Sequence, residues 1–354
     1  MLYIIVAILM FGLLIAVHEF GHFITAKWFH IRVNEFSIGM GPAVFKRQKG
    51  ETLYSLRVLP LGGYCAMEGE DGDSDDPRSF ERAAAWKRGI VLVAGAFMNF
   101  LTGLVLLVIL FAPAQGFLAE VYQGPLEGYG TEHCGLEPGD RILSVDGHQV
   151  LVYGNAQLYL GRAGDVVDFV VERDGQRVEL DNVSLPYQIR VDEEGNETRL
   201  RGILMGSVVD PAGLVEKVEY AFRTALDFVR TVWLSLGDLV RGAVGIRDMS
   251  GPVGIVDTMT QVGEQSPSTA AAVYNLMALS ALIAVNLAVM NLLPIPALDG
   301  GRIFFLILNG LLYLVVRRKI PARYEGYVHM AGMALLLSLM LMVTFSDIGK
   351  LLGV

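Results

Sequence analysis

Four long apolar stretches, nearly free of charged side chains, constrain the fold of this chain more than any other feature. Residues 89–114 and 326–346 contain no Asp, Glu, Lys or Arg, and residues 273–316 contain only two charged residues. About 20 mainly apolar residues are enough to cross a bilayer, and helices this poor in charge are rare in soluble cores. With 53% hydrophobic and 18% charged residues, the sequence predicts a polytopic α-helical membrane protein with four transmembrane helices.

The remaining apolar stretch, residues 2–29, is interrupted by the polar side chains of His18, Glu19 and His22. It lacks the basic start and the small-residue cleavage site of a signal peptide. We therefore expect it to be retained as the first span. The third stretch is long and contains two prolines, so we expect a broken helix there.

The distribution of Lys and Arg predicts the orientation of the spans. Residues 27–88 carry ten basic residues and residues 317–325 carry four, whereas residues 114–272 carry 12 basic against 24 acidic residues. We therefore place the first two segments in the cytoplasm, and the third segment and both termini outside. The formal net charge of −9 argues against a nucleic-acid partner, because such proteins normally present a basic face.

The outer segment begins with a stretch typical of a small β-rich domain. Residues 115–206 alternate between apolar and polar positions, and Asp174-Gly175 predicts a hairpin turn. The stretch CGLEPGDRILSVDGHQV (134–150) resembles the signature of PDZ domains. The resemblance implies a module that adds a peptide, typically a C-terminus, to an open sheet edge. A small sandwich without a ligand is the alternative.

Residues 214–242 predict an amphipathic helix that lies on the outer membrane surface, because apolar and polar positions recur at helical spacing. A fifth span is the alternative, but it would be costly. That span would carry four charged side chains into the lipid: Arg223, Asp227, Arg230 and Asp238.

The first span contains a pattern that points to metal chemistry. Residues 18–22 read His-Glu-Phe-Gly-His, which is HExxH. On a helix, positions i and i+4 share one face, so His18 and His22 can offer nitrogens to one zinc ion. Glu19 can then act as general base toward the attacking water. Ionisable residues inside a membrane are costly and usually functional, which favours a metal site over a polar cluster at the helix end.

A catalytic zinc site takes three protein ligands, and Asp299 is the best candidate for the third. It is the only acidic residue in the long third stretch, and it follows Pro294 and Pro296. Broken backbone at membrane depth is tolerated where it lines a cavity or is buried in protein. The sequence therefore predicts a site formed by the first span and the break in the third.

Other assignments remain open from the residues alone. His30 and Glu35 are less favourable third ligands, because one lies near the membrane edge and the other in a loop. Asp299 could instead pair with Arg302 or cap the helix that follows it. A membrane adaptor, or a metal transporter using the same residues, is the alternative function, although transporters usually contain repeated halves and none is evident in the sequence.

The two motifs together resemble the site-2 protease family of intramembrane zinc metalloproteases, in particular the bacterial regulator-of-sigma-E protease type. The resemblance covers nearly the whole chain. It rests on two main motifs: His18-Glu19-Phe20-Gly21-His22 and Asn291-x-x-Pro294-x-Pro296-x-Leu298-Asp299-Gly300. Further matches are Phe36-Ser-Ile-Gly39-Met-Gly41-Pro42, Gly62-Gly63-Tyr64, Ala94-Gly-Ala-Phe-Met-Asn99-Phe100 and Gly251-Pro252-Val253-Gly254.

The resemblance implies zinc as the cofactor, with His18, His22 and Asp299 as ligands and Glu19 as the base. Asn291 is a weaker candidate for orienting the substrate or for donating to the oxyanion, and a structural amide at the break is its alternative role. Expected substrates are single-span membrane proteins that another protease has already trimmed, such as anti-sigma factors, with remnant signal peptides as a second class. The expected location is the bacterial plasma membrane, with the active site toward the cytoplasm.

The resemblance also implies that residues 35–67 form a membrane-associated β-like segment that presents the substrate strand. Well-known proteobacterial members carry two tandem PDZ domains, whereas this chain has room for one. The predicted organisation is a first span with HExxH (1–34), a β-like cytoplasmic loop (35–88), a second span (89–114), a PDZ domain (115–206), a linker with a surface helix (207–272), a broken third span (273–316) and a fourth span (326–349).

Overall fold

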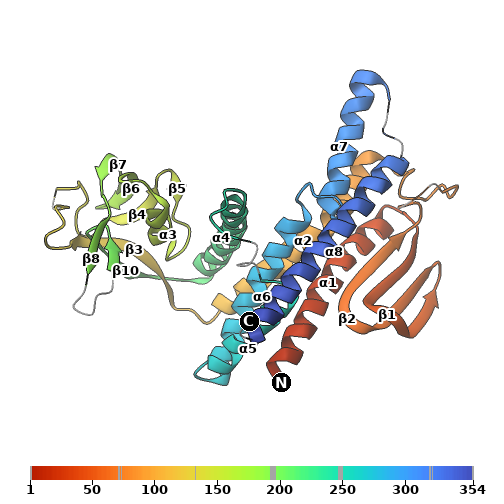
Figure 1. The fold of residues 1–354 in the computed structure, drawn as a ribbon, viewed down its shortest axis with the longest axis horizontal. Helices are drawn as coiled ribbons and strands as arrows, with labels where there is room; N and C mark the ends of the chain where they lie inside the picture. Colours follow the sequence, from red (N-terminus) through yellow and green to blue (C-terminus); the bar gives the residue numbers. More distant parts are fainter. Residues whose placement is uncertain are drawn as a thin grey trace. The chain divides into compact units, whose positions relative to one another are not determined.

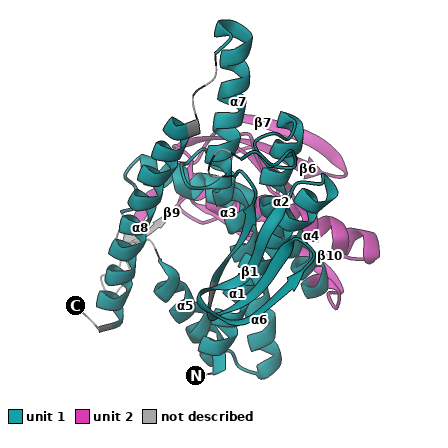
Figure 2. Ribbon diagram, turned by 90° about the vertical axis from the view of Figure 1, so that its right-hand side faces the viewer, with its two compact units in different colours: residues 1–110, 228–354 teal, residues 111–227 magenta. Residues whose placement is uncertain are grey.

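A computed structural model describes residues 2–70, 72, 74–131, 133–191, 197–245, 250–318, 320 and 322–352. The chain divides into two compact units (Figure 2). Unit 1 comprises residues 1–110 and 228–354, and unit 2 comprises residues 111–227. Residues 319 and 321, in the turn that we expect in the cytoplasm, lie outside the described residues.

Among the described residues of unit 1, five helices are long and apolar enough to cross a membrane. They are α1 (Leu2–Trp28), α2 (Ala85–Phe111), α6 (Thr269–Asn291), α7 (Asp299–Val316) and α8 (Ala322–Leu352) (Figure 1). Many of their apolar side chains are exposed in the isolated chain, as suits helices that face lipid. The chain is a polytopic membrane protein that also carries β structure.

The predicted third span forms two helices, so five candidate spans stand where the sequence indicated four. The break lies where we expected it, because Pro294 and Pro296 lack the backbone N–H that a helix needs. Ala297 adopts φ +77°, which also ends helical geometry. The chain re-enters a helix at Asp299.

The segment between α1 and α2 is a long hairpin formed by β1 (Val33–Lys49) and β2 (Thr52–Met67). β2 bends back along β1, so that Phe36 lies opposite both Tyr54 and Cys65. β2 also packs against α1. The hairpin therefore brings a strand to the helix that carries HExxH. It exposes several apolar side chains: Ile38, Met40, Val44, Phe45, Leu56, Val58 and Leu59.

Helix α5 (Pro252–Gln265) had no counterpart in the sequence prediction. It begins at the Gly-Pro-Val-Gly motif and packs against α1, α6 and α8. Asp347 of α8 accepts hydrogen bonds from the backbone N–H groups of Gly251 (2.9 Å) and Gly254 (2.8 Å). A Cβ on either glycine would lie 2.9 Å from an oxygen of this carboxylate. The motif therefore lets a buried acid of one helix cap the start of another.

We expect Asp347→Ala to lower the free energy of unfolding by about 1–3 kcal/mol, because it leaves two backbone N–H groups at a buried helix end without their acceptor. The unfolding midpoint in detergent measures this change. Asp257→Ala is the matched control, since that carboxylate lies on α5 and accepts only an exposed hydrogen bond from Gln261 Nε2 among the described residues. Equal midpoints for the two variants would contradict the proposed cap.

Unit 2 is built on an antiparallel sheet with the strand order β10-β3-β4-β6-β7 and with β5 paired to β4. Its elements are β3 (Gly116–Pro125), β4 (Arg141–Val145), β5 (His148–Gln149), α3 (Asn155–Arg162), β6 (Val166–Arg173), β7 (Gln176–Ser184) and β10 (Ile203–Pro211). A separate pair joins β8 (Gln188–Val191) and β9 (Glu197–Leu200).

The hairpin predicted at Asp174-Gly175 is present, because Arg173 pairs with Gln176. Tyr122, Phe169 and Val171 are fully buried side chains of the sheet. β10 continues to Pro211, past the boundary at residue 206 that the sequence suggested, because its last residue pairs with the first residue of β3.

Helix α4 (Leu214–Val240) fills most of the region where we predicted an amphipathic helix. Its exposed apolar side chains recur at helical spacing: Val215, Val218, Phe222, Leu226 and Trp233. It is not among the helices that are apolar enough to span a membrane in the described chain. The predicted helix is present, and its place on the outer membrane surface stays a prediction.

Candidate metal centre

Two helices of unit 1 bring together the three residues proposed as metal ligands. His18 and His22 lie one turn apart on α1, and Asp299 is the first residue of α7. The Nε2 atoms of the two histidines are 3.2 Å apart. Asp299 Oδ2 lies 3.1 Å from His18 Nε2 and 3.3 Å from His22 Nε2. Both histidines are buried.

These distances fit a zinc ion. Ligand atoms at about 2.0–2.1 Å from one ion, in tetrahedral directions, lie about 3.3–3.4 Å from one another. The three atoms form a nearly equilateral triangle with sides of 3.1–3.3 Å, slightly smaller than this, with two imidazole nitrogens and a carboxylate oxygen as donors. Asp299 Oδ2 is buried and has no hydrogen-bond donor among the described residues. Within the described chain, this is the one group of three or more His, Cys, Asp or Glu side chains close enough to hold a metal.

Helix α2 forms the wall behind the histidines. The backbone carbonyl of Val91 lies 2.8 Å from His22 Nδ1, so this nitrogen carries the hydrogen and leaves the Nε2 lone pair for a metal. Gly95, one turn later, provides the space for both rings. A Cβ at this position would lie 2.7 Å from His18 Cε1 and closer still to His22 Nε2.

The break between α6 and α7 positions Asp299. Gly300 and Gly301 lie directly against backbone of the break itself, so that neither has room for a Cβ. The N–H of Ala297 donates to His329 Nδ1 at 3.0 Å. His329 of α8 therefore holds the loop that carries the proposed third ligand.

Glu19 lies beside the metal-binding cluster and beside β2. It follows His18 directly on α1. Gly63 of β2 is so close that a Cβ there would lie 3.4 Å from Glu19 Cγ. The candidate base therefore lies between the three proposed ligands and the last part of β2.

Asn291, the last residue of α6, also reaches the centre. Its Nδ2 lies 3.4 Å from His18 Nδ1, and the residue is half-buried. Arg302, proposed as an alternative partner of Asp299, pairs with Glu70. The helix α7 is preceded by Leu298 at its N-cap position, and no side chain makes a capping hydrogen bond there.

The two alternative third ligands lie elsewhere. His30 is exposed beyond the end of α1. Glu35 lies in β1 and accepts hydrogen bonds from Ser55 (2.7 Å) and Arg57 (2.8 Å). Burial would raise the pKa of the Glu35 carboxyl, but these hydrogen bonds outweigh it and hold the pKa below its usual value. Neither residue belongs to the cluster.

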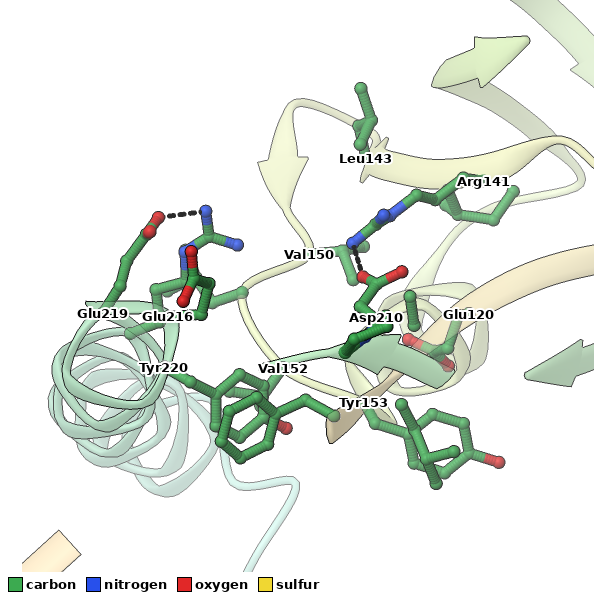
Figure 3. Close-up of a pocket in the computed structure, with 17 residues that line it drawn as sticks. Glu120, Arg141, Leu143, Val150, Val152, Tyr153, Asp210, Glu216, Glu219 and Tyr220 are labelled. Carbon is green, nitrogen blue, oxygen red and sulfur yellow. Dashed lines mark hydrogen bonds and ion pairs between the residues drawn. The ribbon is translucent and has the colours of Figure 1, made fainter. Parts of the chain in front are cut away.

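A separate hollow of about 230 Å³ belongs wholly to unit 2 (Figure 3). It lies between strands of the sheet and the first turns of α4, with Tyr220 and Glu216 on the helix side. Its charged side chains are largely paired with each other, as in Arg141 with Asp210 and Arg223 with Glu219. None of its lining residues belongs to the metal-binding group.

Sequence reasoning missed the outer partners of the histidines. Val91 contributes a backbone carbonyl, which no sequence pattern reveals. Gly95 and Asn99 lie at four-residue spacing after Val91, so the three positions share one face of α2. The sequence of the second span contains that spacing, but only the packing of α2 against α1 shows that these positions face the two histidines.

The model of peptidase family M50 matches residues 6–339. A protein of Clostridium perfringens, whose name assigns it provisionally to the zinc metalloproteases, is 36% identical over 98% of each chain. A similarly named protein of Fusobacterium nucleatum is 35% identical, again over 98% of each chain. The zinc metalloprotease RasP of Bacillus licheniformis is 29% identical over 98% of this chain and 99% of RasP.

Proposed function

The chain belongs to peptidase family M50 and is a bacterial membrane zinc metalloprotease, and from this premise we propose that it cleaves peptide bonds within the membrane-spanning segments of its substrates. One observation carries this proposal: the group of residues able to hold zinc lies on helices that are themselves candidate spans. A site in that position would act on peptide bonds of the substrate that lie within the bilayer.

We assign the roles as follows. His18, His22 and Asp299 hold the zinc ion, which when bound polarises the scissile carbonyl and makes an attacking water more acidic. Glu19 takes the proton from that water and passes it to the leaving amine. Asn291 is the last residue of α6, directly before the break, where its amide can orient the substrate or donate to the oxyanion. These roles agree with the distances within the cluster.

The hairpin of β1 and β2 supports a way to present the substrate. A helix cannot be cleaved while its backbone is fully hydrogen-bonded, so the substrate must unwind locally. Pairing of the unwound segment with the end of β2 would satisfy its backbone groups within the membrane. Gly63 lies in this part of β2 and beside Glu19, so a paired substrate would lie near the base.

We further propose single-span membrane proteins, already trimmed by another protease, as the substrate class. Anti-sigma factors are the expected example, and remnant signal peptides are a second class. The charge distribution along the chain supports a cytoplasmic location for residues 27–88 and an outer location for unit 2. The sheet and α3 of unit 2 support its assignment as a PDZ domain, and β10, at one end of the strand order, is the edge at which we place a peptide C-terminus.

The test uses purified full-length protein in detergent with a single-span model substrate. We expect cleavage inside the span, its loss on treatment with a chelator, and its recovery on addition of zinc. A matched substrate with a large folded outer domain should be cleaved more slowly, because it mimics the untrimmed protein. Cleavage that persists unchanged in the chelator would contradict the metal mechanism. Cleavage confined to exposed loops would contradict the intramembrane site.

A further inference from the structure

The side chain of Asn99 lies behind the metal centre and has an unused hydrogen-bond acceptor. Asn99 is on α2 and only 1% exposed. Its Nδ2 lies 3.4 Å from His18 Nδ1. Its Oδ1 is buried and has no hydrogen-bond partner among the described residues. A buried amide oxygen without a partner is costly, so its presence next to a proposed metal ligand needs an explanation.

The chemistry of His18 explains the unpartnered Oδ1 of Asn99. His18 Nε2 faces His22 and Asp299, so this nitrogen would bind zinc. A neutral imidazole that binds metal through Nε2 carries its hydrogen on Nδ1, and that N–H needs an acceptor. A half-turn of the Asn99 amide about its last torsion exchanges Nδ2 for Oδ1 and moves no other group. It would place the unpartnered oxygen opposite the His18 N–H.

A second side-chain amide lies near His18 Nδ1, and it differs from the Asn99 amide in how deeply it is buried. Asn291 Nδ2 also lies 3.4 Å away, but Asn291 is half-buried at the end of α6. Asn99 is enclosed and lies four residues after Gly95 and eight after Val91, on the α2 face that already contacts His22. The N–H at His18 Nδ1 makes its best hydrogen bond to a single acceptor. The enclosed amide of Asn99 therefore takes this hydrogen bond, and the amide of Asn291 stays available for substrate.

We propose that Asn99 is a positioning residue for zinc, with its Oδ1 accepting the hydrogen bond from His18 Nδ1–H. Val91 does the same for His22 through its carbonyl. Helix α2 thus orients both histidine ligands from one face. This inference rests on the proposed zinc site, and it adds to that site a residue that touches neither the metal nor the substrate.

The experiment measures zinc affinity by chelator competition on the full-length protein in detergent. Loss of the group that accepts a hydrogen bond from a metal-binding histidine typically weakens metal binding by 10–100-fold, and we expect that range for Asn99→Leu and Asn99→Ala. Asn99→Asp keeps an acceptor, so its affinity should stay within about threefold of the natural protein. The cobalt-loaded forms add a second readout, because an unrestrained His18 should change the ligand-field bands of the leucine variant but not those of the aspartate variant.

Asn291→Leu is the matched comparison. It should bind zinc within about threefold of the natural protein and lose cleavage, whereas Asn99→Leu should lose zinc. Equal zinc affinity for Asn99→Leu, Asn99→Ala and the natural protein would overturn the inference, and so would equal weakening by Asn99→Asp and Asn99→Ala. If Asn99→Leu does not fold, the alanine and aspartate pair decides. If the natural protein itself binds zinc no more tightly than His22→Ala, the proposed zinc site fails instead.

Discussion

Replacement of Glu19 by Gln is expected to reduce cleavage by about 10²–10⁴-fold, the usual contribution of a general base, while zinc binding stays unchanged. Gln keeps the size and polarity of the side chain but cannot take a proton from water. Glu19 is adjacent to His18 in sequence but is not one of the three residues that form the metal triangle. This variant should therefore lose cleavage activity and keep its zinc affinity.

The measurement is a single-turnover cleavage rate together with the zinc content of the same sample. Glu264→Gln is the matched control, because Glu264 is an exposed acid on α5, and its cleavage rate should equal that of the natural protein. A Glu19→Gln protein that cleaves at the natural rate would remove Glu19 from the mechanism. A variant that loses zinc together with activity would make Glu19 a determinant of the metal site rather than the base.

The second large effect is expected from Gly95→Ala. A single methyl group on α2 would overlap the positions of both histidine rings, with His18 Cε1 at 2.7 Å and Nε2 at 2.8 Å. Either the rings turn out of the metal triangle or α2 moves away from α1. Both responses separate ligand atoms that must stay within a few tenths of an ångström of their positions. Zinc affinity should fall by more than about 100-fold, and cleavage should fall with it.

Gly89→Ala provides the control on the same helix. Its Cβ would lie 3.7 Å from Leu306 Cδ2, an ordinary van der Waals distance. We expect this variant to bind zinc and to cleave substrate as the natural protein does. Zinc titration followed by calorimetry or chelator competition distinguishes the two. Natural zinc affinity in Gly95→Ala would mean that α1 and α2 can separate at no cost, contrary to the close packing observed.

The features predicted correctly from the sequence depend on local pattern or on strong chemical constraint. Helix α1 follows from an apolar run, and the hairpin at Asp174-Gly175 follows from turn residues that tolerate positive φ. Asp299 was proposed as a ligand because a catalytic zinc site takes three protein ligands; the structure brings it close to His18 and His22, and its role as a ligand stays a prediction. Proline chemistry located the break itself.

The features that were missed depend on contacts between distant parts of the chain. Helix α5 is short, and its start is capped by Asp347, which lies more than 90 residues later. No residue close to α5 in the sequence predicts that cap. Asn99 belonged to one of the matching family motifs, but its place beside His18 follows only from the packing of α2 against α1. Contacts between residues so far apart produce no periodic pattern in a single sequence, so they could not be predicted from it.

The separation of the proposed ligands along the chain has a consequence for biosynthesis. His18 and Asp299 are 281 residues apart, and a ribosome adds about 5–20 residues per second. Some 15–60 seconds therefore pass between synthesis of the first histidine and synthesis of the aspartate. Throughout that interval the nascent chain holds an incomplete set of ligands beside its base. The proposed zinc site therefore stays incomplete until three of the five candidate spans, α1, α2 and α6, and then Asp299 itself have been made.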